Sequence, residues 1–385
     1  MIEDIRRTVI WRGRKDGPTW FHPRPAVIPS TGGGTPQAIM TLQQITGSDI
    51  FGPVHETCSD SLGERWDSPL PIPGMGRTDM GGGLERGVCD VVPGYHAETD
   101  TVLAIGHDVY YRDGKLARPD DQFLGPVYAV KDLDDGSWLS PRRMPPPDTR
   151  MAGICSSGCS QRLHLAGGKI LLPISWAQNR TAPRTVGTLL LSYDGNELVN
   201  ETSTRRGLRL DVGRGLLEPS LTSYDGTYYM TIRAEDGRGY LSTSEDGMEW
   251  SEITPWAWDD GDELEMSTTQ QHWLRHSEGL HLVYTRKTGR NLNVFRWRSP
   301  LLVSRFDTDE MCLVRESERV VFPLIGDGVG DPDHVARMGN FHCVSATADE
   351  SWVTVGETLP AGEWRGNTMM ARIIWKDPNR LAPGF

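Results

Sequence analysis

The amino-acid sequence predicts an all-β protein, a six-bladed β-propeller that forms one domain over residues 1–385. The first observation behind this prediction is the large number of turn-forming and aromatic residues: the chain contains 43 Gly, 26 Pro and 13 Trp. That mixture suits many short strands joined by turns and suits long helices poorly. The second observation is a weak internal repeat of a turn followed by an alternating strand. The third is that no linker or low-complexity run divides the sequence.

The repeat consists of a turn containing Gly or Asp, a strand of alternating apolar residues, and a more polar loop. In residues 223–234, for example, Tyr228, Met230 and Ile232 alternate along one strand and so face the same side of a sheet. Copies lie roughly 50–70 residues apart, near or above the length of a propeller blade. The four copies are residues 96–111, 165–176, 223–234 and 276–287.

The strand segments group into six blades of four strands. The Pro-rich segment 142–147 is expected to join two blades, because Pro removes a backbone donor. Closure of a propeller usually combines strands from both ends of the chain, so residues 371–375 are expected to form the closing strand. The expected blades are residues 20–70, 85–142, 150–200, 215–253, 265–325 and 335–380.

A second recurring motif predicts hairpin turns. Residues 243–250 and 59–66 approximate the pattern Ser-x-Asp-x-Gly-x-x-Trp, and Thr243 and Glu245 replace its Ser and Asp in the first of them. In such a turn a short hydroxyl or acidic side chain bonds the backbone, Gly takes positive φ, and Trp packs beneath the loop. Residues 192–195 and 135–138 are partial copies.

Charge and hydropathy exclude several classes of partner. The formal net charge of −12 predicts neither a nucleic-acid nor a membrane partner, although a local arginine cluster can still bind a small anion. No stretch approaches the roughly 18 apolar residues of a membrane span. The first 17 residues lack an apolar signal core, so the chain as given is expected to be cytoplasmic. Secretion stays open for a chain whose leader has been removed.

The cysteines do not predict a metal site. Only two of the six lie close together in sequence, and a structural zinc site requires four ligands in tighter pairs. They are expected to be free buried thiols, and no metal or cofactor is predicted. The six are Cys58, Cys89, Cys155, Cys159, Cys312 and Cys343.

Three features resemble the sialidase superfamily, whose members are six-bladed propellers that remove terminal sialic acid. They are the His-Pro-Arg-Pro-Ala of residues 22–26, the Leu-Glu-Pro-Ser of residues 217–220 followed by Arg233, and the turn motifs, which resemble Asp-boxes (BNR repeats). The similarity is a pattern spread over most of the chain, and residues 218–250 are its most specific part. The resemblance implies a sialidase-like glycoside hydrolase.

The resemblance also implies roles for individual residues. The family's first-blade arginine matches Arg24, and its acid/base aspartate, about 25 residues further on, matches Asp49. The family's fourth-blade glutamate and its second arginine match Glu218 and Arg233.

The third arginine of the family comes from the fifth blade. It is assigned here to Arg298, with Arg296 and Arg286 as alternatives. Three guanidinium groups can bind one carboxylate through several charge-assisted hydrogen bonds, which fix its orientation as well as its affinity.

One departure concerns the nucleophile. The family uses a tyrosine of the last blade, activated by the fourth-blade glutamate, whereas Tyr284 is the final tyrosine of this chain. Residues 338–343, where the nucleophile is expected, read Met-Gly-Asn-Phe-His-Cys. Three alternatives therefore stay open: Tyr284 attacks from another blade, water attacks directly, or the chemistry differs from that of the family. Sialic acid as the substrate also stays open.

The leading hypothesis is an exo-acting glycosidase that removes a terminal sialic or uronic acid from a glycan. Asp49 would donate the proton to the leaving oxygen, and Glu218 would act as a base or as an electrostatic partner of the transition state. His96 and His107 fall in the second blade, where polar groups often line the far end of the substrate, and are candidate substrate contacts.

Two other functions remain open. In a polysaccharide lyase that acts on uronates, an arginine neutralises the carboxylate while a His or Tyr abstracts the C5 proton. Its product is an unsaturated uronate that absorbs in the near ultraviolet. In a non-catalytic carbohydrate-binding propeller, replacing Asp49 or Glu218 weakens binding at most. The histidines available to a lyase are His22, His96, His107 and His272.

Overall fold

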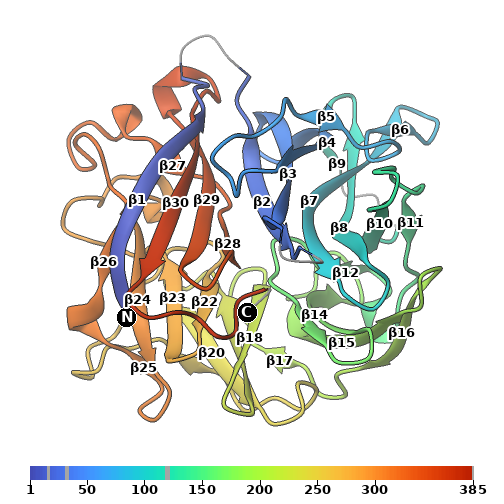
Figure 1. Ribbon diagram of the computed structural model, residues 1–385. Helices are drawn as coiled ribbons and strands as arrows, with labels where there is room; N and C mark the ends of the chain where they lie inside the picture. The colour runs from blue at the N-terminus through green and yellow to red at the C-terminus, as the bar shows by residue number, and fades with distance from the viewer. Residues whose placement is uncertain (15–17, 31–33, 118–121, 384–385) are drawn as a thin grey trace.

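The structure is a computed structural model that describes residues 1–14, 18–30, 34–117 and 122–383. Its strands form six antiparallel sheets, which follow one another around a central axis in chain order (Figure 1). The protein is therefore a six-bladed β-propeller, and the predicted fold class is confirmed. Each expected blade range coincides with one of the six sheets to within about ten residues, except that the sixth sheet also contains residues 2–11, which no expected range included.

The first three blades are formed by residues 21–209. Blade 1 contains β2 (Phe21–Ile28), β3 (Gln37–Gly47), β4 (Ile50–Ser59) and β5 (Leu70–Pro71). Blade 2 contains β6 (Thr78–Asp79), β7 (Leu84–His96), β8 (Thr101–Arg112), β9 (Lys115–Ala117), β10 (Pro126–Asp132) and β11 (Arg142–Arg143). After the turn η1 (Thr149–Met151), blade 3 contains β12 (Ile154–Ser156), β13 (Leu163–Leu165), β14 (Lys169–Ala177), β15 (Thr185–Tyr193), β16 (Leu198–Ser203) and β17 (Leu208–Arg209).

The remaining blades follow in the same way. Blade 4 contains β18 (Leu217–Tyr224), β19 (Thr227–Arg233), β20 (Gly239–Ser244) and β21 (Thr254–Pro255). Blade 5 contains β22 (His272–His276), β23 (Gly279–Tyr284), β24 (Leu301–Asp307), β25 (Cys312–Leu313) and β26 (Arg319–Phe322), with the turns η2 (Phe295–Trp297) and η3 (Arg315–Ser317). Blade 6 contains β27 (Arg337–Met338), β28 (His342–Ser345), β29 (Glu350–Thr358), β30 (Thr368–Trp375) and β1 (Ile2–Trp11), with the turns η4 (Pro332–His334) and η5 (Pro360–Gly362).

Blade 6 closes the ring with strands from both ends of the chain. The first strand, β1, pairs antiparallel with β30, and Ile5 lies opposite Ile373 (blue beside red in Figure 1). Residues 371–375 therefore lie in the closing blade, as expected. The sequence did not indicate their partner, because β1 is an outer strand in which Ile5 alone is buried, so its residues show little apolar alternation.

The core lies between the blades. Apolar residues on the two faces of each sheet pack against the neighbouring sheets, which explains the alternation seen in the sequence. Between blades 4 and 5, for example, Trp256, Trp273 and Phe306 meet edge to face with ring centroids 5.4 to 5.7 Å apart. A ring of such contacts makes the inner strands a rigid frame for a site at the centre.

The turn after β20 differs in detail from its prediction. Ser244 and Asp246, rather than Thr243 and Glu245, hold the turn: the Ser244 hydroxyl accepts a hydrogen bond from the backbone N–H of Gly247 at 2.9 Å. The Asp246 carboxylate accepts two more from the backbone. The expected pair is displaced by one position because β20 ends with the Ser244 side chain turned inward, at 6% exposure.

No helix among the described residues has the length and apolar character needed to cross a membrane. The helical segments in that part of the chain are turns of three residues.

Buried histidines are expected to make the fold sensitive to acid. Burial lowers the pKa of His272 and of His281 to about 3, against about 6.5 in an unfolded chain. The unfolded chain therefore binds a proton between pH 6.5 and 3 that the folded chain does not. The free energy of unfolding is therefore highest above pH 6.5. Below that pH it falls by about 1.4 kcal/mol per pH unit for each such histidine.

The variant His281→Gln is expected to reduce this slope by about one histidine's share, ~1.4 kcal/mol per pH unit, in urea unfolding at pH 7, 6 and 5. The matched control is His334→Gln. His334 is exposed, and Asp331 raises its pKa, so its removal should leave the slope unchanged or slightly steeper. Equal slopes for the His281 variant and the wild type would contradict the prediction.

Candidate functional site

Three inner strands carry a bulge with a polar residue in a strained conformation. The register of β2, β7 and β18 shifts against the next strand, and each shift contains a non-glycine residue with positive φ. These residues are His22 (52°), Asp90 (56°) and Glu218 (46°). Such a conformation costs about 1–3 kcal/mol and persists where the surrounding structure enforces it, and bulges are common next to active sites. The bulges therefore mark one level of the central channel as a candidate site.

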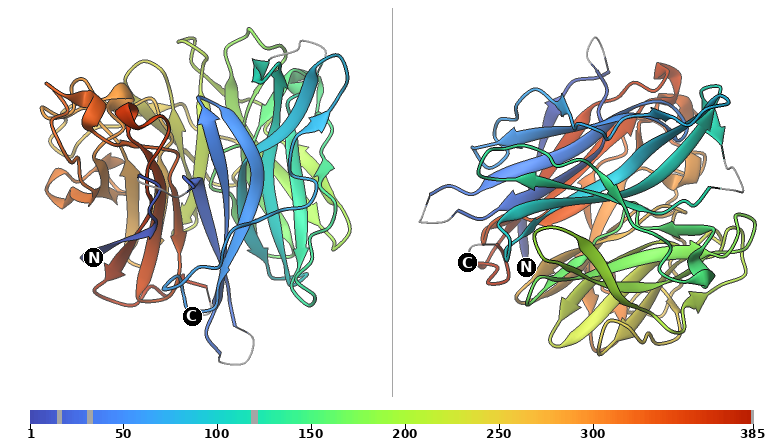
Figure 2. Two further views of the ribbon diagram at one scale, coloured as in Figure 1. Left: turned by 90° about the horizontal axis from the view of Figure 1, so that it is seen from above. Right: turned by 90° about the vertical axis from the view of Figure 1, so that its right-hand side faces the viewer.

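A cavity of about 710 Å³ opens at this level. Inner strands of blades 1, 4 and 6 and the turns η2, η4 and η5 supply its walls, and these turns lie toward one end of the propeller (orange and red in Figure 2, left). Arginines and carboxylates dominate the wall, whereas none of the described residues that line it is a Tyr. Its charged residues are Asp49, Arg214, Glu218, Arg233, Glu235, Arg296, Arg298, Asp333, Arg337 and Glu363.

Five of the predicted site residues meet in this cavity: Asp49, Glu218, Arg233, Arg296 and Arg298. Asp49 is exposed and sits with φ 58° in the turn between β3 and β4. It faces the cavity from blade 1, whereas the other four come from blades 4 and 5.

Glu218 and Arg233 form an ion pair across the hairpin of β18 and β19. The Arg233 guanidinium donates from Nη1 to Oε1 of Glu218 at 2.7 Å. Burial favours the neutral form of Glu218, but the Arg233 cation outweighs it, so the pKa of this carboxyl lies below its usual value. Glu218 is therefore ionised at neutral pH, and its Oε2 is buried without a hydrogen-bond partner in the described part of the chain.

Arg298 brings an uncompensated positive charge into the cavity. Its Nε is buried and has no hydrogen-bond partner among the described residues. Burial, together with the neighbouring Arg233 and Arg296 cations, lowers the pKa of Arg298 to about 10. A buried cation without a partner is unfavourable, so this group is poised to bind an anion.

Arg24 lies beneath the cavity rather than on its wall. It is 1% exposed, and its Nη2 lies 2.5 Å from Oδ1 of Asp90. Nδ1 of His22 lies 3.0 Å from the same oxygen. Burial alone would raise the pKa of Asp90, but Arg24 and then His22 hold it well below the usual range. Arg24 therefore reaches the cavity only through Asp90 and His22, of which His22 lines the wall.

Tyr284 does not lie at the cavity, so its position does not fit the predicted role of nucleophile. Its side chain is fully buried between blades 4 and 5, and its hydroxyl donates to the Glu318 carboxylate at 2.7 Å. Burial raises the pKa of Tyr284 well above 10, so the hydroxyl stays protonated. Tyr284 ends β23, the second strand of its blade, and its side chain packs in the core between blades 4 and 5. Its neighbour Arg286 pairs with the same Glu318 at 2.6 Å.

His96 and His107 are also internal, and neither lines the cavity. His96 is 1% exposed and is hydrogen bonded to Thr99 at 2.8 Å and to the Gly168 carbonyl of blade 3 at 3.1 Å. His107 lies on β8, where its Nε2 is 3.4 Å from the Cys89 thiol. Both positions are those of structural histidines, in contrast to the substrate contacts expected for them.

Several residues of the site were not predicted from the sequence. Arg214 bonds Glu235 on the wall and, against the effect of burial, lowers the pKa of that carboxyl to about 2. Arg337 and Asn340 come from the broken inner strand of blade 6. Among the residues that the sequence analysis missed, only Asp90 could have been recognised from the sequence. It is a single carboxylate inside the otherwise apolar run 88–92, where a charged group is unexpected.

One group of side chains in the described structure has the spacing of a metal site: Cys89, Asp90 and His107, whose potential ligand atoms lie within 4.8 Å of one another. Their chemistry fits a cation poorly. Arg24 and His22 already occupy the carboxylate of Asp90, and burial raises the pKa of the Cys89 thiol well above its usual value. We therefore assign no metal to this group.

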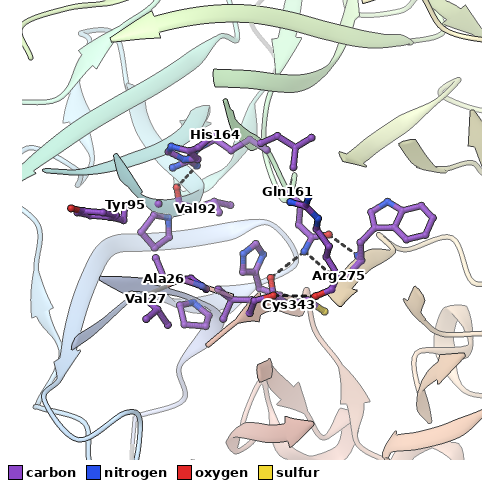
Figure 3. Close-up of a pocket in the computed structure, with 18 of the residues that line it drawn as sticks. Ala26, Val27, Val92, Tyr95, Gln161, His164, Arg275 and Cys343 are labelled. Carbon is purple, nitrogen blue, oxygen red and sulfur yellow. Dashed lines mark hydrogen bonds between the residues drawn. The ribbon is translucent and has the colours of Figure 1, made fainter. Parts of the chain in front are cut away.

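A second, smaller pocket of about 310 Å³ lies at the other end of the inner strands. Figure 3 shows apolar side chains such as Ala26 and Val92 across the pocket from Gln161 and Arg275. None of the described residues that line it is Asp or Glu, so it lacks the acid and base that glycoside hydrolysis requires. The acidic and arginine-rich cavity is therefore the candidate active site.

Comparisons with known proteins place the fold among solved structures. No family model matches the sequence, and no curated protein matches it. A sialidase of Trypanosoma rangeli, solved with a difluorinated keto-deoxy-nononic acid, superposes with a TM-score of 0.62 at 12% identity over 96% of this chain. This chain spans 58% of the length of that sialidase.

Two further solved structures are similar. A Hadza microbial sialidase gives a TM-score of 0.66 at 11% identity, over 96% of this chain and 68% of the other. An α-L-arabinanase of Penicillium chrysogenum with bound arabinobiose gives a TM-score of 0.54 at 12% identity, over 94% of this chain and 97% of the other. At these identities the likeness establishes the fold, and the function has to be argued from the cavity.

Proposed function

We propose that this protein is a glycoside hydrolase that removes a terminal acidic sugar, a sialic or uronic acid, from a glycan. The observation that carries the proposal is the Arg298 side chain, whose buried Nε has no hydrogen-bond partner among the described residues and which lies beside Arg233 in a cavity of about 710 Å³. A sugar carboxylate would satisfy both arginines through charge-assisted hydrogen bonds. The sialidases named above have the same fold, whereas arabinobiose carries no carboxylate, so it is the arginines that favour an acidic sugar.

The chemistry follows from two carboxyl groups on the wall. Asp49 protonates the glycosidic oxygen as the bond from that oxygen to the anomeric carbon breaks. Water forms the new bond to the anomeric carbon and gives its proton to the ionised Glu218, whose negative charge also favours the oxocarbenium-like transition state. Because the described wall contains no Tyr, we assign the attack to water rather than to a tyrosyl nucleophile.

An activity screen across sialyl and uronosyl oligosaccharides tests the proposal. Hydrolysis adds the mass of one water to the products of each cleavage, without near-ultraviolet absorbance. The expected result is release of the terminal acidic sugar and its loss in Glu218→Gln. Intact substrate throughout, together with measurable binding, would instead support a carbohydrate-binding propeller.

His22 favours a uronate lyase as a second candidate. It lines the cavity, Asp90 lies 3.0 Å from its Nδ1, and burial lowers its pKa so that it is neutral at pH 7. A neutral imidazole could take the C5 proton while the C4–O bond breaks, a C4–C5 double bond forms and the leaving oxygen takes a proton from water. The same screen distinguishes the two reactions, because elimination adds no water and its product absorbs in the near ultraviolet.

Tyr284→Phe is expected to leave turnover of the substrate within about threefold, because its hydroxyl lies in the core. Stability should fall by about 1–2 kcal/mol, since the buried bond to the Glu318 carboxylate is lost. Steady-state kinetics and urea unfolding measure the two effects. A loss of turnover as large as that of Glu218→Gln would restore the tyrosine as the candidate nucleophile.

A further inference from the structure

Two arginines of the cavity wall flank one exposed aromatic ring. The guanidinium carbon of Arg296 lies 4.9 Å from the centre of the Phe295 ring, and that of Arg337 lies 5.1 Å from it. Phe295 is 50% exposed. Phe295 and Arg296 come from η2 in blade 5, whereas Arg337 comes from β27 in blade 6, so the group bridges two blades. We call Arg296 and Arg337 the outer arginine pair, and Phe295 is its ring.

Neither outer arginine forms an ion pair with a carboxylate in the part of the chain that the structure describes. Nε of Arg337 is buried without a hydrogen-bond partner among the described residues. Burial lowers the pKa of Arg337, and the negative charge of Asp333 offsets this shift only in part. Burial and the nearby Arg233 cation likewise lower the pKa of Arg296. The carboxylates of Glu218 and Glu235 on the same wall are already engaged by Arg233 and Arg214. The outer pair thus retains its positive charge for a ligand.

The backbone holds this group in a strained conformation. Arg296 and Trp297 are consecutive non-glycine residues with φ of 52° and 47°, and the Ser267 hydroxyl donates to the Arg296 carbonyl. Two such residues cost about 1–3 kcal/mol each, and strain of this kind is typical of ligand-binding segments. The conformation places Phe295 and Arg296 beside Arg298, which lies only two residues further on.

We propose that the outer arginine pair and its ring bind the carboxylate of a second sugar, so that the substrate is a run of acidic sugars rather than a single acidic cap on a neutral glycan. This inference rests on the proposed function, in which Arg233 and Arg298 hold the terminal carboxylate. Arg296 and Arg337, whose guanidinium groups lie over the Phe295 ring, bind the carboxylate of the second sugar. The exposed part of Phe295 borders that sugar.

Calorimetry with matched ligands tests the inference. The protein is the full chain carrying Asp49→Asn, which prevents turnover. The first pair of ligands is digalacturonic acid and the same disaccharide methyl-esterified on its reducing sugar, and the second pair is disialic acid and sialyllactose. Within the pair that binds, the ligand with two carboxylates is expected to bind about tenfold more tightly. Adding Arg337→Gln should remove this preference and leave the affinity for the ligand with one carboxylate within about twofold.

The control is Arg275→Gln, which removes an arginine that lines the opposite pocket and should leave the preference intact. Equal affinity for both members of a pair, or an equal loss of both in the Arg337 variant, would overturn the second subsite and leave the proposed function standing. If neither pair binds, or if Arg298→Gln leaves all affinities unchanged, the proposed function fails and the second subsite fails with it.

Discussion

Arg298→Gln is expected to lower kcat/KM on the acidic substrate by about 10²–10³-fold and, at the same time, to stabilise the fold by about 0.5–2 kcal/mol. The loss of rate follows because the arginine would no longer hold the carboxylate while the glycosidic bond breaks. The gain in stability follows because Arg298 is a half-buried cation beside Arg233 and Arg296, its Nε is buried without a hydrogen-bond partner, and no carboxylate of the described residues pairs with it. Opposite changes in activity and stability are typical of residues kept for function.

Kinetics and urea unfolding of the same variant measure both effects. The matched control is Arg275→Gln, because Arg275 is another arginine whose Nε is buried without a partner in the described structure, at the opposite pocket. It should leave kcat/KM unchanged. An Arg298 variant that is less stable than the wild type and retains its activity would show that this cation is structural.

Asp90→Asn is expected to destabilise the fold by about 3–5 kcal/mol, the largest single effect on stability that we predict. The carboxylate is 8% exposed and lies within 3.0 Å of both the Arg24 and the His22 side chains. An amide cannot neutralise Arg24, so the variant would bury an unpaired cation at the centre of the ring. Activity should fall as well, because His22 on the cavity wall loses the group that orients it.

The pH dependence of the Asp90 effect provides a second measurement. The pKa of Asp90 in the fold lies well below its value of about 3.9 in an unfolded chain. The contribution of this carboxylate to the free energy of unfolding is therefore full above about pH 3.9 and decreases as the pH falls below it. The difference between wild type and variant should therefore be constant from pH 7 to 5 and narrow below about pH 4. Asp49→Asn, at an exposed carboxylate, is the control and should not shift the urea midpoint. A difference that persists unchanged at pH 3 would contradict the assignment of charge to Asp90.

The parts of the fold and site that depend on local sequence were predictable. Alternation and turn residues located the six blades because each hairpin forms from neighbouring residues. Glu218 and Arg233 are only 15 positions apart on one hairpin, and the resemblance to sialidases assigned both to the site, whereas the ion pair between them was not predicted. Arg296 and Arg298 were likewise assigned from the resemblance, as candidates for the fifth-blade arginine of the family, and both lie at the turn η2.

Features that depend on the closure of the ring were not predictable. Arg24 and Asp90 are 66 positions apart and meet only when blades 1 and 2 stand side by side. Alternation placed Tyr284 on a strand but did not reveal that β23 is the second strand of its blade and not the one that lines the channel. Arg337 lies in β27, a strand of two residues, which is too short to produce any periodic signal.

The pairing of β1 with β30 has a consequence for how the chain reaches its native state. Ile5 and Ile373 are 368 positions apart in the sequence, so this sheet cannot be completed until the chain between them has been synthesised and the two strands have met. Contacts of such long sequence separation form late and slowly. During synthesis, β1 therefore stays unpaired with its edge exposed until β30 has been made, and an exposed edge of this kind is a site for chaperone binding and aggregation.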